Sequence, residues 1–158
     1  MEKPKFVYVT FIRTTPEKLW SALTDPKFTR QYFFNSYQES AWKTGAPWKM
    51  VFPDGHAAAS GEVLMIDPPR KLVLAWKGEK PELKDEAVSL LTYQLEQQDD
   101  MVKLTVLHES GDGSDKLIQA VSSGWPMILA SLKSLLETGE SLPSTRNAPA
   151  NGQCGANR

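Results

Sequence analysis

A long amphipathic segment near the C-terminus constrains the fold more than any other feature of the chain. Its apolar residues recur at the three- and four-residue spacing of a helix: Leu117, Val121, Trp125, Ile128, Leu132 and Leu135. Ser114 or Asp115 can cap its start, and Gly139 can end it. Pro126 removes a backbone donor inside the segment and predicts a bend near Gly124. A helix of this length requires an extended apolar surface to cover.

A run of short strands supplies that surface. Segments rich in β-branched, aromatic and alternating apolar residues predict strands at 5–13, 36–42, 47–52, 57–66, 71–77, 87–97 and 101–110. Turn residues separate them, such as Pro53-Asp54-Gly55 and the two prolines of 67–70. Consecutive strands with short connections predict an antiparallel sheet, one face of which must be buried.

Two short helices are expected after the first strand. Thr15 can cap the first helix, Pro16 suits its first position and Glu17 complements its dipole. Asp25-Pro26 ends it, and a second helix is expected over 27–34. The complete order predicts an α+β helix-grip fold, in which a curved antiparallel sheet of six to seven strands wraps around the long C-terminal helix.

Three segments carry a resemblance to a known family: Thr15–Pro26, Gly61–Trp76 and Gly124–Gly139. In this order and spacing, over about residues 5–142, the chain resembles the START-like (SRPBCC, Bet v 1-like) superfamily, in the branch similar to the activator of Hsp90 ATPase homologue. The resemblance implies the helix-grip fold. It leaves the function open, because the superfamily includes lipid carriers, hormone receptors and polyketide cyclases.

The composition excludes several classes of partner. A net charge of −1, with both signs interspersed, lacks the basic face that nucleic acid requires. No apolar run reaches the ~20 residues of a membrane span, and we expect a cytoplasmic protein. One folded domain is expected over 1–142 and a disordered polar tail over 143–158, in which the single Cys154 cannot form an internal disulfide.

Metal, phosphate and cofactor motifs are missing from the sequence. The two histidines, His56 and His108, are far apart and have no cysteine partners, so no metal is expected. Gly111-Asp112-Gly113 fits a turn better than a phosphate cradle. His56 follows a turn and is expected in solvent, and the charged run 77–86 is expected as a solvated loop, with a moving lid as the alternative.

The aromatic residues form the candidate ligand site. By the two-residue period of strands, three strands should present their larger apolar residues inward. Tyr32 and Phe33 should close one end, and the C-terminal helix should contribute its own face. The predicted site comprises Tyr32, Phe33, Trp48, Met50, Phe52, Trp76, Tyr93, His108, Gly124, Trp125 and Ile128. These residues either fill a core or surround a ligand-sized cavity, and both interpretations remain open.

Polar residues near the site leave further alternatives. His108 shares a strand face with Leu104 and Val106, so it either orients a ligand or transfers a proton, or it forms a structural hydrogen bond at the strand end. Glu62 and Glu109 are either buried acid–base groups or solvated strand-face charges.

Three functions therefore remain as hypotheses. The first is a non-enzymatic module that holds a small apolar or aromatic molecule, without cofactor, as a monomer or weak dimer. The second is a protein-interaction role resembling chaperone ATPase activation. The third is a cyclase or hydrolase in the same cavity, with His108 and either Glu62 or Tyr93 as its acid–base groups.

Overall fold

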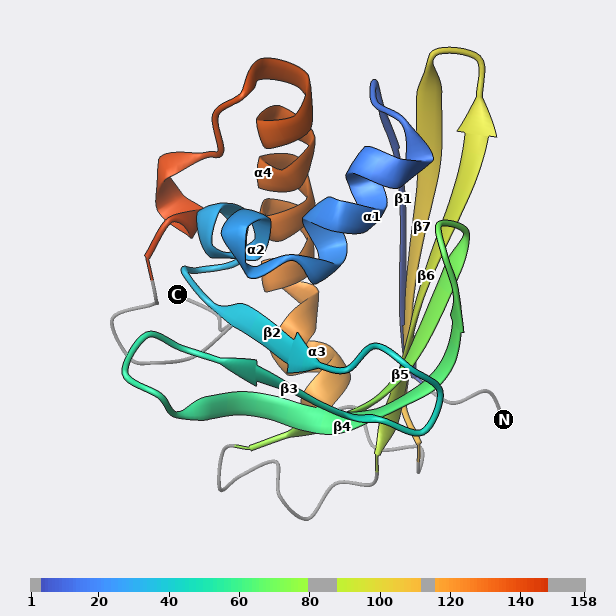
Figure 1. Ribbon diagram of the computed structural model, residues 1–158. Coiled ribbons are helices and arrows are strands. Elements are labelled where there is room, and N and C mark those ends of the chain that lie inside the picture. The colour runs from blue at the N-terminus through green and yellow to red at the C-terminus, as the bar shows by residue number, and fades with distance from the viewer. Residues whose placement is uncertain (1–3, 80–87, 112–115, 148–158) are drawn as a thin grey trace.

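The chain folds as one antiparallel sheet closed around helices at its concave face. The computed structural model describes residues 4–79, 88–111 and 116–147. The seven strands are β1 (Lys5–Ile12), β2 (Tyr37–Ser40), β3 (Pro47–Val51), β4 (Ala57–Asp67), β5 (Lys71–Gly78), β6 (Ser89–Gln98) and β7 (Met101–Glu109). The sheet order is β1-β7-β6-β5-β4-β3-β2. Figure 1 shows the sheet bending from upright β1, β7 and β6 to the nearly perpendicular β4, β3 and β2.

The helices are α1 (Pro16–Thr24), α2 (Pro26–Tyr32), α3 (Lys116–Ser122) and α4 (Gly124–Thr138). The expected capping of α1 is confirmed, since Thr15 Oγ1 accepts from the Lys18 N–H at 3.2 Å. Asp25 ends α1 by donating its N–H to Ser21 O at 2.8 Å, and its carboxylate starts α2 by accepting from the Lys27 N–H at 2.9 Å. One aspartate therefore sets the angle between the two helices.

The long C-terminal helix is divided at Ser123 into α3 and α4, one residue from the predicted bend at Gly124. Pro126 explains the position of the division, because it has no N–H to offer Ser122 O and its ring would clash with that carbonyl. Because Pro126 lies in the first turn of α4, its missing N–H costs no hydrogen bond, since the N–H groups of a first turn have no partner within their own helix. Gly139 ends α4 as expected, with φ +89°.

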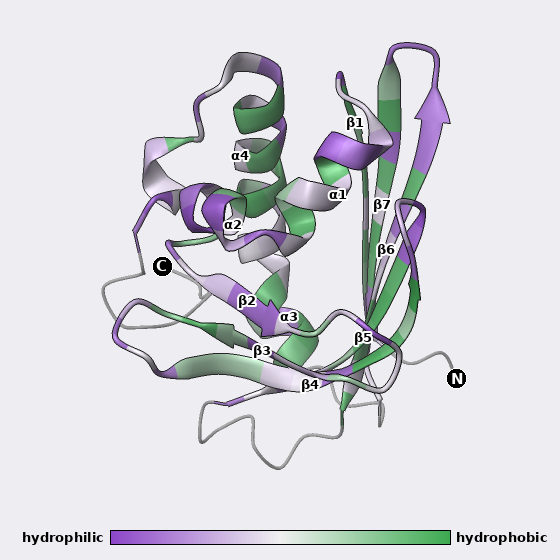
Figure 2. Ribbon diagram, in the orientation of Figure 1, coloured by the Kyte–Doolittle hydropathy of each residue, from purple (hydrophilic) through white to green (hydrophobic). Residues whose placement is uncertain are grey.

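The core lies between the concave face of the sheet and α1, α2 and α4. The predicted inward residues of β3, β5, β6 and β7 are all buried, which confirms the strand periodicity. Figure 2 shows hydrophobic residues along α4 and the strands it covers, and hydrophilic residues along β2 and the far end of β6. Val51 follows the inward-facing Met50, yet it is itself buried at 4% exposure, because the register with β4 shifts between Met50 and Val51.

The ordered chain continues beyond the expected domain boundary at Leu142. Residues Pro143–Thr145 form a 3-10 turn, and Thr145 is completely buried. Its hydroxyl donates to Ser131 Oγ at 2.6 Å, and its carbonyl accepts from the Phe34 N–H at 2.7 Å. These hydrogen bonds tie residues 143–147, which the sequence analysis assigned to the polar tail, to α4 and to the α2–β2 connection. Residues 148–158, with Cys154, lie outside the described residues.

Two other expectations also concern residues that the structure does not describe. The capping residues Ser114 and Asp115 belong to 112–115, and most of the expected charged loop belongs to 80–87. Within the described ranges, no helix is long and apolar enough to cross a membrane.

Gly61 provides a test of the contact between β4 and β5. A Cβ at this position would lie 1.7 Å from Ala75 O, so Gly61→Ala must push two paired strands apart. We expect a loss of about 3 kcal/mol in the free energy of unfolding, measured by urea denaturation. Gly55→Ala is the control, because its Cβ meets no atom and only the positive φ is strained, at a cost of about 1 kcal/mol. Equal losses in the two variants would contradict this account of Gly61.

Candidate functional site

Aromatic rings from six elements meet where α4 faces the sheet. We define the aromatic cluster as Tyr32, Phe33, Trp48, Trp76, Tyr93, His108 and Trp125, each at most 4% exposed. All seven were predicted site residues, and the structure brings them into one chain of ring contacts. Strand periodicity predicted that Trp48, Trp76, Tyr93 and His108 face inward, and the curvature of the sheet brings β3 and β5 toward α4.

Trp125 lies at the centre of this cluster. Its ring centre is 5.6 Å from Phe33, 6.2 Å from Trp76, 6.2 Å from His108 and 6.3 Å from Tyr93. Three of these four contacts are edge-to-face, the geometry that the aromatic quadrupole favours. Trp125 therefore links the first turn of α4 to α2, β5, β6 and β7 at once.

The rings predicted to form cavity walls contact each other directly. Trp48 and Trp76 have centres 4.8 Å apart, whereas two rings that sandwich a guest are separated by about 7 Å, because each contact takes about 3.5 Å. No guest fits between these two rings as they stand. The ligand-sized cavity itself stays a prediction.

A directed hydrogen-bond chain runs through the cluster from α4 to β5. The Trp125 indole can only donate, so His108 Nδ1 accepts from Trp125 Nε1 at 3.2 Å. The proton of neutral His108 is then on Nε2, which donates to Ser89 Oγ at 2.8 Å. The Ser89 hydroxyl in turn donates to Trp76 O at 2.9 Å. These three bonds assign the tautomer of His108.

The same chain determines what His108 can do chemically. Burial lowers the pKa of His108 from 6.5 to about 3. A second proton on the ring would be on Nδ1, where it would face the Trp125 N–H, and two donors would then oppose each other. His108 is therefore a neutral structural group at neutral pH, as in the structural alternative of the sequence analysis, and its hydrogen bonds occupy both ring nitrogens.

The other polar atoms of the cluster are engaged as well. Tyr32 Oη donates to Ala22 O at 2.7 Å, and burial raises the pKa of this hydroxyl further above its ordinary value. Trp48 Nε1 donates to Gln38 Oε1 at 2.9 Å. Across the described ranges, no buried side-chain nitrogen or oxygen lacks a hydrogen-bond partner. The interior thus presents π faces and no free polar atom.

Four predicted site residues are buried but contribute no ring contact to the cluster. They are Met50, Phe52, Gly124 and Ile128. The ring of Phe52 instead contacts His56 at 4.9 Å, and His56 is exposed as expected.

Two polar residues of the site were not predicted. Ser89 precedes Leu91 and Tyr93 on the inward face of β6 at the two-residue period, so the pattern could have revealed it. Gln38 is 3% exposed on β2, and no sequence signal marked it as the partner of Trp48.

Of the acid–base groups considered for catalysis, His108 and Tyr93 lie in the cluster, whereas the two glutamates do not. Glu62 is exposed on β4, and Glu109 is half-buried on the outward side of β7. In the part of the chain that the structure describes, no three His, Cys, Asp or Glu side chains are grouped to hold a metal.

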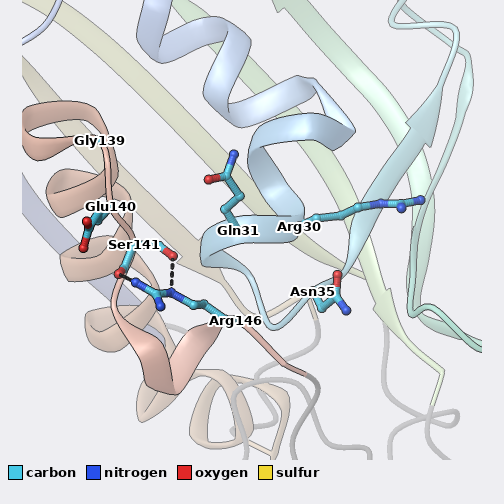
Figure 3. Close-up of a pocket in the computed structure, with 7 residues that line it drawn as sticks. All are labelled: Arg30, Gln31, Asn35, Gly139, Glu140, Ser141 and Arg146. Carbon is cyan, nitrogen blue, oxygen red and sulfur yellow. Dashed lines mark hydrogen bonds between the residues drawn. The ribbon is translucent and has the colours of Figure 1, made fainter.

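An exterior groove lies between the end of α2 and the segment that follows α4. It encloses about 560 Å³ and is lined by Arg30, Gln31, Asn35, Gly139, Glu140, Ser141 and Arg146. Figure 3 shows the guanidinium of Arg146 bonded to Ser141, while Arg30 points the other way. There Arg30 stacks over Tyr37 at 4.4 Å. The two cations do not converge on one anion, so the groove suits a broad polar contact.

The fold and the aromatic interior define a helix-grip domain of the START-like (SRPBCC) class. Residues 13–137 match the family described as activator of Hsp90 ATPase homolog 1-like protein. The chain belongs to this family, which confirms the resemblance seen in the sequence.

Solved structures share the fold at low identity. CalU16 from Micromonospora echinospora is 23% identical with a TM-score of 0.71, over 89% of this chain and 78% of that one. The Aha1 dimer from Colwellia psychrerythraea is 21% identical with a TM-score of 0.69, over 87% and 99%. PFC0360w, an Hsp90 activator from Plasmodium falciparum, is 21% identical with a TM-score of 0.68, over 84% and 95%. A search of curated proteins found no match.

The lowered pKa of His108 predicts a specific loss of stability in acid. Between about pH 3 and pH 6.5 the unfolded chain binds more protons than the folded one, so this contribution is complete above pH 6.5 and is lost as the pH falls. Well below pH 6.5 the loss approaches about 1.4 kcal/mol per pH unit. His108→Gln keeps one donor and one acceptor without titrating. Urea denaturation from pH 7 to pH 4 should show a steeper decline in the native protein than in this variant. If the free energy of unfolding fell equally with pH in the native protein and in the variant, the lowered pKa of His108 would be contradicted.

Proposed function

We propose that this protein is a binding module for a small, flat aromatic molecule, held by the aromatic cluster between the sheet and α4. The observation that carries the proposal is the meeting of seven rings from six elements in one cluster, in which Trp125 contacts four of the others. Aliphatic side chains would fill a core without this concentration of π faces. The family and the fold are consistent with such a module.

The chemistry of the interior specifies the class of ligand. Because every polar atom of the cluster has a partner, a guest with buried donors or acceptors would leave them unpaired, at a cost of about 1–3 kcal/mol each. A guest without such groups avoids this cost, and its own ring contacts of about 0.5–1.5 kcal/mol each offset the contacts between rings that it displaces. An apolar aromatic compound is therefore favoured over a sugar, nucleotide or amino acid.

Binding requires that Trp125 gives way. Its single polar anchor is the 3.2 Å bond to His108, and it stands two residues after the division between α3 and α4. Among the core residues, those of α3 are less completely buried, with Leu117, Ile118 and Val121 at 5–9% exposure. A small movement of α3 and the Trp125 ring would let a guest replace existing ring contacts.

This proposal predicts stabilisation by apolar aromatic compounds. Naphthalene or biphenyl should raise the Tm and change the tryptophan fluorescence, with about 2.7 kcal/mol of stabilisation at 100 times the Kd. Trp125→Leu and Trp76→Leu should weaken binding at least tenfold, because each removes a ring that contacts the guest. Trp20→Leu is the matched control, since Trp20 packs outside the cluster.

Two outcomes would contradict the proposal. One is a Tm and a fluorescence spectrum that stay unchanged with both compounds up to their solubility. The other is an equal response to octane, which has no ring and would show unspecific apolar binding.

A second candidate is a role resembling the activation of an Hsp90-type ATPase. It is supported by the family description and by the printed descriptions of two structural neighbours as Aha1 and as an Hsp90 activator. In this role the exterior would make the contact, and the exposed Arg30 beside the groove is a suitable contact residue.

This candidate predicts faster ATP hydrolysis when the protein is added to a purified Hsp90-type ATPase at micromolar concentration. Arg30→Glu should reduce the stimulation severalfold, because it reverses a charge at the groove. Lys103→Glu is the control, since Lys103 lies on the outer face of the sheet. Unchanged turnover with the native protein would exclude the role for that ATPase.

A further inference from the structure

Strand β1 has a free edge. It is the terminal strand of the sheet and pairs only with β7 among the described strands. The Ser110 N–H donates to Pro4 O at 2.9 Å, so Pro4 is one of the residues of this segment whose backbone faces β7. Hydrogen-bonded pairs alternate along an antiparallel ladder, so the even-numbered residues of β1 bond to β7. The odd-numbered residues point their N–H and C=O groups away from the sheet.

Side chains of α4 occupy one end of this edge. Lys133 Nζ donates to Phe11 O, and the Arg13 N–H donates to Glu137 Oε2 at 2.8 Å. Both bonds confirm that odd-numbered backbone groups face outward. Val7 and Val9 lie further along the edge, and among the described residues they form no bond outside the strand. The edge thus offers two N–H and two C=O groups in extended geometry.

The side chains beside these groups are apolar and exposed. Val7, Val9 and Phe11 are 52%, 46% and 40% exposed on the convex face. Between Lys5 and Arg13 the strand has no charge, no proline and no bulge. Natural edge strands are normally protected by such features, so an unprotected edge of this kind is a surface for strand addition.

We propose that β1 is a self-association edge, at which two copies of this chain pair antiparallel with Val7 of each copy opposite Val9 of the other. This register uses all four free backbone groups of each copy and joins the two sheets into one. The pairing is isologous, because the same edge serves both copies around a two-fold axis. The exposed apolar side chains of the two strands become neighbours on one face.

The charges at the ends favour a second copy over an unrelated strand. In the proposed register Lys5 lies opposite Phe11 of the second copy, where the carboxylate of Glu137 is bonded to the Arg13 N–H and paired with Lys133 of its own copy at 2.8 Å. Each copy therefore brings a second lysine to the other copy's glutamate. A strand from another protein would use the same backbone groups but would lack this pair of complementary contacts.

The expected association is weak. A single strand pair is small beside the roughly 1,200 Å² lower end of stable protein interfaces. The dimer should therefore dissociate on dilution, and its population should rise with protein concentration. The exposed ion pairs should make it salt-sensitive.

Sedimentation velocity of the native protein from micromolar to millimolar concentration tests the proposal. Val9→Pro removes only an outward N–H, a position at which an edge strand tolerates proline, and should leave a monomer at every concentration. Val9→Lys serves where the proline variant does not fold, because it adds an edge charge and leaves the backbone unchanged. Lys5→Glu should weaken association about tenfold by placing two carboxylates together.

Thr105→Lys is the matched control. Thr105 lies beside Val9 on β7, on the same face but one strand away from the edge, so this variant should still dimerise. A native protein that stays monomeric throughout, or a dimer that survives in both Val9 variants, overturns the proposal. Loss of the dimer in Thr105→Lys but not in Val9→Lys would assign the contact to the sheet face and also overturn it. An unchanged Lys5→Glu dimer overturns the proposed register.

Discussion

The contact between Trp125 and His108 joins the two layers of this protein. It binds the first turn of α4 to β7, and through Ser89 and Trp76 O the same hydrogen-bond chain reaches β6 and β5. A helix that covers a curved sheet needs such an anchor, because apolar packing alone leaves its position along the sheet poorly defined. This contact places Trp125 at the centre of the aromatic cluster, and it fixes which ring nitrogen of His108 carries the proton.

A fully hydrogen-bonded interior affects the choice among functions. His108 is neutral at neutral pH and both of its ring nitrogens are hydrogen-bonded, while Glu62 is exposed on β4 and Glu109 lies on the outward side of β7. The aromatic cluster presents its ring faces to one another. Outside, the groove beside Arg30 and the edge of β1 present surfaces of different chemistry.

Much of the fold could be predicted from local patterns. Alternation along the strands identified the inward residues, and Thr15, Asp25 and Pro126 marked helix boundaries close to those observed. Patterns failed where a distant partner decides the outcome. Thr145 looked like part of a polar tail, yet Ser131 and Phe34 hold it in the core. Val51 is buried because its strand shifts register against β4.

The sequence by itself determined which residues face inward, because strand and helix periods are properties of the backbone. It also determined where α4 begins, since proline cannot donate a hydrogen bond. Tertiary structure alone decided that the rings contact each other, that Ser89 and Gln38 satisfy His108 and Trp48, and that β1 is left as an edge. These outcomes depend on the curvature and order of the strands, which bring together residues far apart in the chain.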